Sequence, residues 1–321
     1  MGPAAMTGGR VQGAATTAPA RVSIVIASAQ QETDVRRCLE SLSGELTSAD
    51  ETIVVHSGSP MDLGSMARDH PEVLILTAPE GASVPDLRYR GLERARGEIV
   101  AMTEAAAMFT PGWLERIVTL HAAGYDAVGG AIDPAPDLDG VSWAAHLCEY
   151  GAYMSPVVDG EGGNFSGFHA SYKRSLLEKC EASIRGRYWE GVLHAEARCH
   201  GGSFFRCGDL RLLNTRRHTV GSFLRQQFVY GRGFGCIRGQ RSSFVGHAVL
   251  SVVTVGLPAL MMYRYGSWIV AKRLPPGRSL VSLPLLLLFA CGWSMGEWVG
   301  YLDAMRERLR HRAPTDMSGS A

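Results

Sequence analysis

The sequence predicts an α/β protein with a mainly parallel sheet flanked by helices, followed by a hydrophobic helical hairpin near the C-terminus. Short apolar, β-branched runs alternate with segments of helical periodicity up to about residue 123, which is typical of right-handed βαβ units. Farther along, residues 242–263 and 279–296 contain no Asp, Glu, Lys or Arg. A chain of 321 residues has room for one main domain and such an appendage.

Four strands are predicted in the first third of the chain, each rich in the β-branched residues that a parallel sheet buries on both faces. They are Arg21–Ser28, Thr52–His56, Val73–Leu76 and Glu98–Met102. Leu210–Leu213 has the same character and is predicted to form a late strand. Because ligands bind beyond the carboxyl ends of parallel strands, we expect Ser28, His56 and the segment 103–107 to meet in one cleft.

Three helices are predicted between and after the first strands. In the first of them, Val35, Leu39 and Leu42 recur at helical spacing, and the third has a proline in its first turn. The helices are Glu32–Ser43, Asp86–Arg96 and Pro111–Ala123.

A glycine-rich stretch follows the late strand. Ser222–Phe228 has helical spacing, and Gly231, Gly233 and Gly235 then interrupt it, so we predict a loop at these glycines. The stretch GRGFG lacks the preceding strand and the following helix of a dinucleotide-binding fingerprint, and this excludes that motif.

Composition excludes several classes of protein. Hydrophobic residues make up 46% of the chain and charged residues 20%, which is unlike disordered, collagen-like or disulfide-rich proteins. A net charge of +1 gives no argument for a nucleic-acid partner. The seven scattered cysteines include no CxxC pair, so we expect reduced thiols and no zinc ribbon.

The two uncharged stretches near the C-terminus predict membrane association. Arg241 and Arg264 bracket 22 uncharged residues, and a hydrocarbon core of about 30 Å requires about 20 helical residues. Basic residues flank the outer ends of both stretches, which places these ends on the cytoplasmic side of a hairpin. The loop between the stretches is also basic, however, and a basic loop resists translocation. Interfacial or re-entrant helices therefore remain an alternative, as does a soluble core helix pair.

The expected organisation has four parts. Residues 1–20 are rich in Gly, Ala, Thr and Pro and lack the apolar core of a signal peptide, so we predict a disordered leader. Residues 21–240 form the α/β domain, residues 241–312 the membrane-associated helical segment, and residues 313–321 a disordered tail.

Segments along the whole chain resemble, in their order, those of bacterial family 2 glycosyltransferases with the GT-A fold. VSIVIAS and the later CLESL are similar to the opening strand and helix of that family, and ETIVVHSGS is similar to its second strand. LRYRGLERARGEIVAMTE and TPGWLERIV resemble the segments on either side of its acidic motif. GFHASYKRSLL, WEGVLHAEARCHGG and FLRQQFVYGRGFG are similar to its substrate loop, its acidic acceptor-side motif and its arginine-rich segment. GWSMGEWVGYL resembles the last apolar helix of membrane-bound members, so the resemblance spans about residues 21–303.

The resemblance implies a GT-A-like, Rossmann-like fold and a sugar transfer reaction. The donor would be a nucleotide sugar and the acceptor a lipid-linked molecule or a saccharide of the cell envelope, as in polysaccharide biosynthesis. The transfer would invert the sugar's configuration, at the cytoplasmic face of the bacterial cell membrane. No nucleic-acid partner is implied.

In such enzymes a divalent metal, Mg²⁺ or Mn²⁺, neutralises the donor diphosphate. Counting back from TPGW places the family's acidic triplet on Glu104, Ala105 and Ala106, of which Glu104 alone keeps a carboxylate. The charge of the donor diphosphate would therefore be neutralised by a metal bound to Glu104, or by arginines in place of a metal.

The resemblance also indicates candidate site residues. Glu190 is the candidate general base, because inverting transfer needs a carboxylate to accept the proton of the acceptor hydroxyl. A structural carboxylate near Arg185 or Arg187 is the alternative interpretation of Glu190. The donor-side candidates are Ser28, His56, Arg90 and Glu104. The acceptor-side or phosphate-side candidates are His169, Trp189, His194, Arg225 and Arg232.

Some of these residues have structural alternatives. For His56 and His194 we favour structural hydrogen-bonding roles over catalytic ones. Arg225 and Arg232 would equally serve as anchors for lipid headgroups. Two hypotheses of function follow: a membrane-associated glycosyltransferase, or a catalytically impaired relative that acts as a scaffold or partner subunit. The retained Glu190 favours the first hypothesis, whereas Ala105 and Ala106 favour the second.

Overall fold

The computed structural model describes residues 21–29, 32–57, 66, 68–185, 190–242 and 244–312, which form two compact units. The sheet unit contains the described residues up to Ala135 together with Tyr153–Arg216. The helical unit contains Pro136–Ala152 and the described residues from Arg217 onward. The sequence analysis placed a domain boundary at residue 240, whereas the sheet unit ends at Arg216. The predicted leader 1–20 and tail 313–321 lie outside the described residues.

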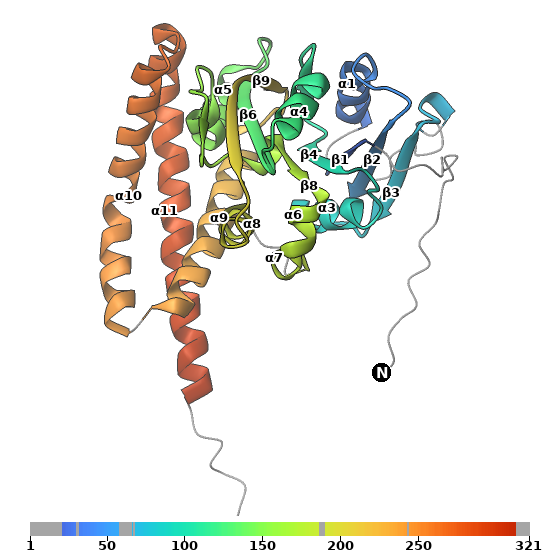
Figure 1. The fold of residues 1–321 in the computed structure, drawn as a ribbon. Coiled ribbons are helices and arrows are strands. Elements are labelled where there is room, and N and C mark those ends of the chain that lie inside the picture. Colours follow the sequence, from blue (N-terminus) through green and yellow to red (C-terminus); the bar gives the residue numbers. More distant parts are fainter. Residues whose placement is uncertain are drawn as a thin grey trace, which may run out of the picture. The chain divides into compact units, whose positions relative to one another are not determined.

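In the described part of the chain, the sheet unit is built on a nine-stranded sheet (Figure 1). The strand order is β3-β2-β1-β4-β8-β6-β9-β5, and β7 pairs with β9. The strands from β3 to β4 run parallel, whereas β8 is antiparallel to both of its neighbours, β4 and β6. The strands are β1 (Val22–Ser28), β2 (Asp50–Ser57), β3 (Val73–Ala78), β4 (Ile99–Glu104), β5 (Ala107–Phe109), β6 (Ala127–Pro134), β7 (Gly160–Glu161), β8 (Ala170–Lys173) and β9 (Phe204–Asn214).

Helices flank this sheet, so the predicted α/β fold class is confirmed. In the view of Figure 1, α1 and α4 lie above the sheet, and α3, α6 and α7 lie below it. The helices of the sheet unit are α1 (Glu32–Ser43), α3 (Val84–Leu92), α4 (Trp113–Ala122), α6 (Arg174–Lys179), α7 (Glu181–Arg185) and α8 (Glu190–Cys199). The parallel arrangement that the sequence predicts holds from β3 to β4, and the sheet becomes mixed where β8 enters it.

Apolar periodicity explains the first elements. All seven residues of β1 are buried, as expected for a central strand with a packed layer on each face. Helix α1 has the predicted bounds, and it buries the predicted residues Val35, Leu39 and Leu42. The late strand predicted at Leu210–Leu213 is confirmed as part of the longer β9.

The carboxyl ends of the parallel strands meet at one edge of the sheet. In the strand register, Ser28 at the end of β1 pairs with His56 in β2, and Ala27 pairs with Glu104 at the end of β4. The predicted convergence of Ser28, His56 and the segment 103–107 is therefore confirmed. Parallel pairing fixes this arrangement, because it aligns the ends of strands that are far apart in the sequence.

The helical unit consists mainly of α5 (Gly140–Tyr150), α9 (Val220–Arg241), α10 (Phe244–Ala271) and α11 (Pro276–Arg312). The predicted loop at Gly231, Gly233 and Gly235 is wrong, because α9 runs through all three glycines. A Cβ atom on Gly231 would lie 2.2 Å from the carbonyl oxygen of Trp293, and one on Gly235 would lie 2.2 Å from that of Glu297. The glycines therefore let α9 and α11 pack backbone to backbone, a contact with a partner about 60 residues away that local propensity does not reveal.

We expect Gly231→Ala to destabilise the helical unit and Gly233→Ala to stabilise it slightly. Alanine is more favourable than glycine inside a helix by about 0.8–1 kcal/mol, and nothing lies within 4 Å of a Cβ atom on Gly233. At Gly231 the added atom meets the main chain of α11, so the helices must separate, at a net loss of about 1–3 kcal/mol. Unfolding temperatures of both variants in the same detergent measure the difference. Equal stability of the two variants would contradict the close contact.

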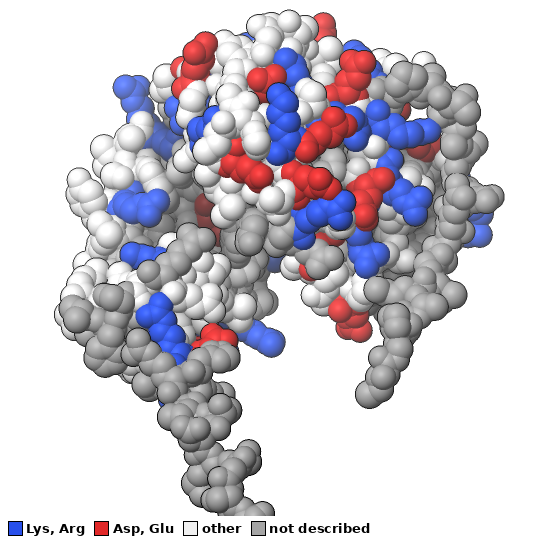
Figure 2. Space-filling view, turned by 60° about the horizontal axis from the view of Figure 1, so that its bottom comes forward, with Lys and Arg blue, Asp and Glu red and all other residues white. Residues whose placement is uncertain are grey.

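Two helices, over Val249–Ala271 and Pro276–Arg308, are long and apolar enough to cross a membrane, judged by length and composition. Several large apolar side chains of α10 are exposed, among them Val252, Val255 and Val270. On the face of the molecule shown in Figure 2, by contrast, acidic and basic side chains are intermixed without a large area of one sign.

Candidate functional site

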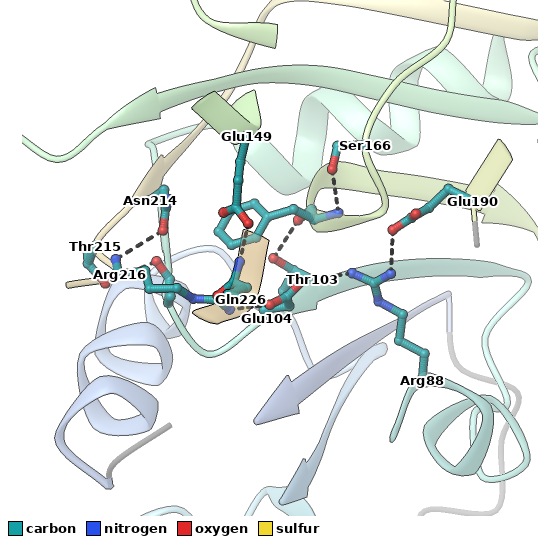
Figure 3. A network of polar contacts seen from close by, with 12 residues as sticks. Arg88, Thr103, Glu104, Glu149, Ser166, Glu190, Asn214, Thr215, Arg216 and Gln226 are labelled. Atoms are coloured by element: carbon teal, nitrogen blue, oxygen red, sulfur yellow. Dashed lines mark hydrogen bonds and ion pairs between the residues drawn. The ribbon is translucent and has the colours of Figure 1, made fainter. Parts of the chain in front are cut away.

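Glu104, the last residue of β4, lies between two arginines (Figure 3). Arg88 Nη2 donates to Glu104 Oε1 at 3.1 Å, and Arg216 Nη2 binds the other carboxylate oxygen. The side chain of Glu104 is 9% exposed, and those of Arg88 and Arg216 are 11% and 16% exposed. Burying an unpaired charge costs roughly several kcal/mol. These three side chains are therefore stable at their positions only when all three are present.

Helix α3 positions Arg88. Ser83 caps the helix, since its Oγ accepts from the Asp86 main-chain N–H while the Asp86 carboxylate accepts from the Ser83 N–H at 3.1 Å. Leu87 is fully buried and fixes which face of α3 packs on the sheet. Arg88 is the next residue, and its side chain extends to the edge of the sheet where Glu104 lies.

The segment that follows β9 positions Arg216. The Thr215 main-chain N–H and the Thr215 hydroxyl both donate to the carbonyl oxygen of Ala106, at 2.8 Å and 3.0 Å. The Arg216 main-chain N–H donates to Asn214 Oδ1 at 3.0 Å. These bonds hold the chain beside Ala105 and Ala106, so the guanidinium of Arg216 reaches Glu104.

Glu190, the first residue of α8, joins the same network. Arg88 Nη1 donates to Glu190 Oε1 at 2.8 Å. Gly167 makes this pair possible, since a Cβ atom there would lie 2.2 Å from Glu190 Oε1 and 2.6 Å from Arg88 Nη1. Of the alternative partners, Arg185 forms its ion pair within α7, and Arg187 lies outside the described residues. Arg88 thus links a carboxylate at the sheet edge with a carboxylate at the start of a helix.

The network keeps Glu190 ionised. Burial raises the pKa of Glu190, but the charge and the hydrogen bond of Arg88 outweigh this effect and hold the pKa below its ordinary value. Burial lowers the pKa of Arg88, and the charges of Glu190 and Glu104 more than compensate, so this pKa is raised. At neutral pH Glu190 is therefore an anion, as a proton acceptor must be.

Comparison with known proteins identifies the domain that contains Arg88 and Glu104 of this network. Residues 23–180 match the family model described as Glycosyl transferase family 2. Residues 23–180 form a family 2 glycosyltransferase domain. Together with the mixed sheet flanked by helices, this match confirms the GT-A-like fold class that the resemblance implied.

Two known proteins are similar over part of the chain. "Putative glycosyltransferase EpsH" of Bacillus subtilis (strain 168) is 25% identical over 171 residues, which is 49% of this chain and 48% of that protein. The chain thus spans about half the length of this curated relative. A solved structure described as "Crystal Structure of a Mycobacterial Protein" has a TM-score of 0.46 and 15% identity, and the match covers 66% of this chain and 73% of that chain.

In the glycosyltransferase domain, the predicted donor-side residues Ser28 and His56 lie at the same sheet edge as Glu104. Both are buried, and His56 Nδ1 is 3.3 Å from Ser28 Oγ. The Ala105 main-chain N–H donates to Ala27 O at 3.0 Å, which holds the end of β4 against β1. Hydrogen bonds therefore connect the ends of these three strands.

His169 and His194, predicted on the acceptor or phosphate side, lie in the core. His169 is 1% exposed, with Nε2 accepting from Trp113 Nε1 at 2.8 Å and Nδ1 donating to Ala131 O at 2.9 Å. His194 is 2% exposed, and its Nε2 is 2.8 Å from the Tyr172 hydroxyl oxygen. Burial lowers the pKa of each ring to about 4. These contacts support the structural hydrogen-bonding role for both histidines.

The other predicted phosphate-side or acceptor-side residues belong to the helical unit or are not described. Arg225 and Arg232 are exposed residues of α9, in the helical unit. Arg232 Nε donates to Asp303 Oδ2 of α11 at 2.7 Å. Trp189 lies outside the described residues.

The described side chains of the glycosyltransferase domain do not fit a divalent metal. Both carboxylate oxygens of Glu104 bind arginines. Where the family has further acids, Ala105 and Ala106 supply buried methyl groups. Within the described ranges between residues 21 and 312, no group of three or more His, Cys, Asp or Glu side chains could hold a metal ion. Glu104 is thus a partner of arginines.

Arg88 and Arg216 were missed by the sequence analysis, which chose Arg90 from the segment LRYRG. Residues two apart in a helix point in different directions, and the packing of α3 decides that Arg88 reaches the carboxylates. Arg216 is the second residue after the carboxyl end of β9. The carboxyl-end rule, applied to the predicted strand Leu210–Leu213, was the signal that could have found it.

Proposed function

We propose that this chain transfers a sugar from a nucleotide-sugar donor to a lipid-linked or saccharide acceptor of the cell envelope, with inversion. One observation supports the proposal above all others. Arg88 joins Glu104, at the carboxyl end of a central parallel strand of a family 2 glycosyltransferase domain, to the ionised Glu190, which follows that domain in the sequence. Ligand sites of open α/β sheets lie at such strand ends.

In the proposed reaction Glu190 is the general base. Its carboxylate accepts the proton of the acceptor hydroxyl while the hydroxyl oxygen attacks the anomeric carbon of the donor sugar. The bond between that carbon and the diphosphate oxygen breaks, and its electron pair leaves with the nucleoside diphosphate. Attack opposite the leaving group inverts the configuration. Ser28 and His56 would contact the donor from the ends of β1 and β2.

We place this activity at the cytoplasmic face of a bacterial membrane. The length and apolar composition of α10 and α11 support contact with lipid. An acidic residue of α11, Glu297, is satisfied within the helical unit, since Arg238 Nη1 and Trp293 Nε1 donate to it at 3.0 Å and 3.1 Å. The pairing reduces the cost of bringing that carboxylate near a bilayer. Basic residues flank the outer ends of both apolar stretches, which supports a cytoplasmic location for these ends.

A catalytically impaired scaffold or partner subunit is the second candidate function. Ala105 and Ala106, which replace acidic residues of the family motif, favour it. A scaffold of this kind would bind partners or donors without turnover, so measured sugar transfer separates the two functions.

Transfer is tested with membranes that contain the full chain, donors labelled in the sugar, and lipid extracted from bacterial membranes as acceptor. UDP-, GDP- and dTDP-sugars form the donor panel. The proposed function expects label to enter the lipid phase, with one nucleoside diphosphate released for each sugar transferred. If a donor binds but its sugar is not transferred, the proposed enzymatic function is overturned and the scaffold function remains.

We expect Arg88→Met to make activity sensitive to acid. In the unchanged protein the pKa of Glu190 is held below its ordinary value, so kcat/KM should be flat between about pH 5.5 and 8. Without Arg88, burial is the largest remaining influence and raises the pKa of Glu190, so kcat/KM should fall as the pH decreases within this window. Arg94→Met, at an exposed position beyond the end of α3, is the control and should keep the flat profile. A uniformly low but flat profile for Arg88→Met would contradict this role of Arg88.

A further inference from the structure

We propose that Arg216, supported by Arg88, takes the place of a divalent cation, so that the chain binds the donor diphosphate without metal. This inference rests on the proposed function. It begins with a mismatch: the domain belongs to a family whose resemblance implied a metal, and its side chains do not fit one.

The position of Arg216 is the first support. Thr215 makes two hydrogen bonds to the carbonyl oxygen of Ala106, the last position of the family's acidic triplet in this chain. The arginine that follows Thr215 is therefore fixed by main-chain contact beside the two alanines. A fixed positive charge thus lies where acids would have held a metal.

The charge of the cluster is the second support. A divalent cation beside the carboxylates of Glu104 and Glu190 would give a net charge of zero. These two carboxylates with the guanidinium groups of Arg88 and Arg216 have the same net charge, because arginine stays protonated at every physiological pH. The cluster therefore presents a diphosphate with the net charge that a metal beside the two carboxylates would present.

The chemistry and burial of the guanidinium are the third support. Its planar N–H groups match the geometry of phosphate oxygens, and charge-assisted bonds of this kind are among the strongest in proteins. The side chain of Arg216 is 16% exposed, so water screens its charge little. Arg88 has a different part in the cluster, since it binds both Glu104 and Glu190. We therefore assign phosphate binding to Arg216 and positioning to Arg88.

Isothermal titration of the full chain in detergent with UDP, GDP and dTDP tests the inference, in EDTA and then with Mn²⁺ or Mg²⁺. At least one of these probes should bind in EDTA, with an affinity that either metal changes less than about twofold. Arg216→Gln should weaken binding about 10–100-fold, as expected for the loss of charged hydrogen bonds. Arg217→Gln, at the neighbouring exposed arginine, is the control and should bind like the unchanged chain.

Glu104→Gln keeps the test decisive even if Arg216→Gln does not fold. A metal ligand cannot be replaced by an amide without loss of binding, whereas removing a negative charge beside Arg216 should leave diphosphate binding in EDTA equal or tighter. Weaker binding by Glu104→Gln, or binding by the unchanged chain that requires added metal, would overturn the inference and leave the proposed function standing. If none of the three diphosphates binds with or without metal, both the inference and the proposed function fail.

Discussion

Replacing Glu190 by Gln is expected to lower the turnover number of sugar transfer by about 10³-fold, because a positioned acid–base group contributes about 10²–10⁴-fold. The amide cannot accept the proton of the acceptor hydroxyl. Its carbonyl oxygen still accepts a hydrogen bond from Arg88, so the local structure should persist. Binding of the nucleoside diphosphate should change less than about threefold, since Glu190 acts on the acceptor.

Initial rates at saturating donor, together with titration of the nucleoside diphosphate, measure this prediction. Glu178→Gln is the matched control, because Glu178 is an exposed carboxylate of α6. It should keep full activity. If Glu190→Gln retains more than about a tenth of the turnover number, the base is another group and Glu190 serves only to hold Arg88.

Acidification from pH 7 to pH 5 is expected to destabilise the sheet unit by about 5 kcal/mol. His121, His169 and His194 are each at most 4% exposed, and burial lowers the pKa of each ring to about 4. An unfolded histidine has a pKa of about 6.5, so below that pH the unfolded chain takes up protons that the folded chain does not. Stability is therefore complete above about pH 6.5 and is lost between about pH 6.5 and 4, at about 1.4 kcal/mol per pH unit for each ring.

Hydrogen exchange of β4 and β8 measures this loss within the sheet unit. After correction for intrinsic exchange, protection factors should fall by about 10³-fold or more between pH 7 and 5. His194→Phe removes one of the three rings and should reduce the pH slope by about a third, whatever its effect at pH 7. His200→Gln changes an exposed ring and should leave the slope unchanged. Protection that does not depend on pH in this range would show that the three rings are not held neutral.

Local sequence patterns were sufficient for the first half of the fold. The bounds of α1 follow from apolar spacing, and the carboxyl-end rule placed Ser28, His56 and Glu104 together. The helix through Gly231 was missed because its stability depends on α11, and no local pattern reports a partner so distant in the sequence. Propensity describes glycine as a helix breaker, whereas close packing makes it the residue that fits.

In the candidate site, too, some residues could be predicted from the sequence and others could not. Both carboxylates of the network, Glu104 and Glu190, were found from the order of the segments. The arginines that bind these carboxylates were not found, because their roles depend on the direction of a side chain from α3 and on the hydrogen bonds of Thr215 to Ala106. Which charges neutralise a carboxylate is a property of the packed structure, and the sequence shows only that arginines are available.

Three of the buried histidines, His121, His169 and His194, lie around the four residues of β8. His121 Nε2 is 2.9 Å from Ser171 Oγ, His194 binds Tyr172, and His169 directly precedes the strand. β8 is also the seam that joins the parallel strands to the rest of the sheet, and Gly167 beside the Arg88–Glu190 pair lies just before it. Acid should therefore open the sheet along β8 and separate Glu104 from Glu190 before Glu190 takes up a proton. The lowest pH at which the protein stays folded then depends on this one short strand and not on the proton affinity of Glu190.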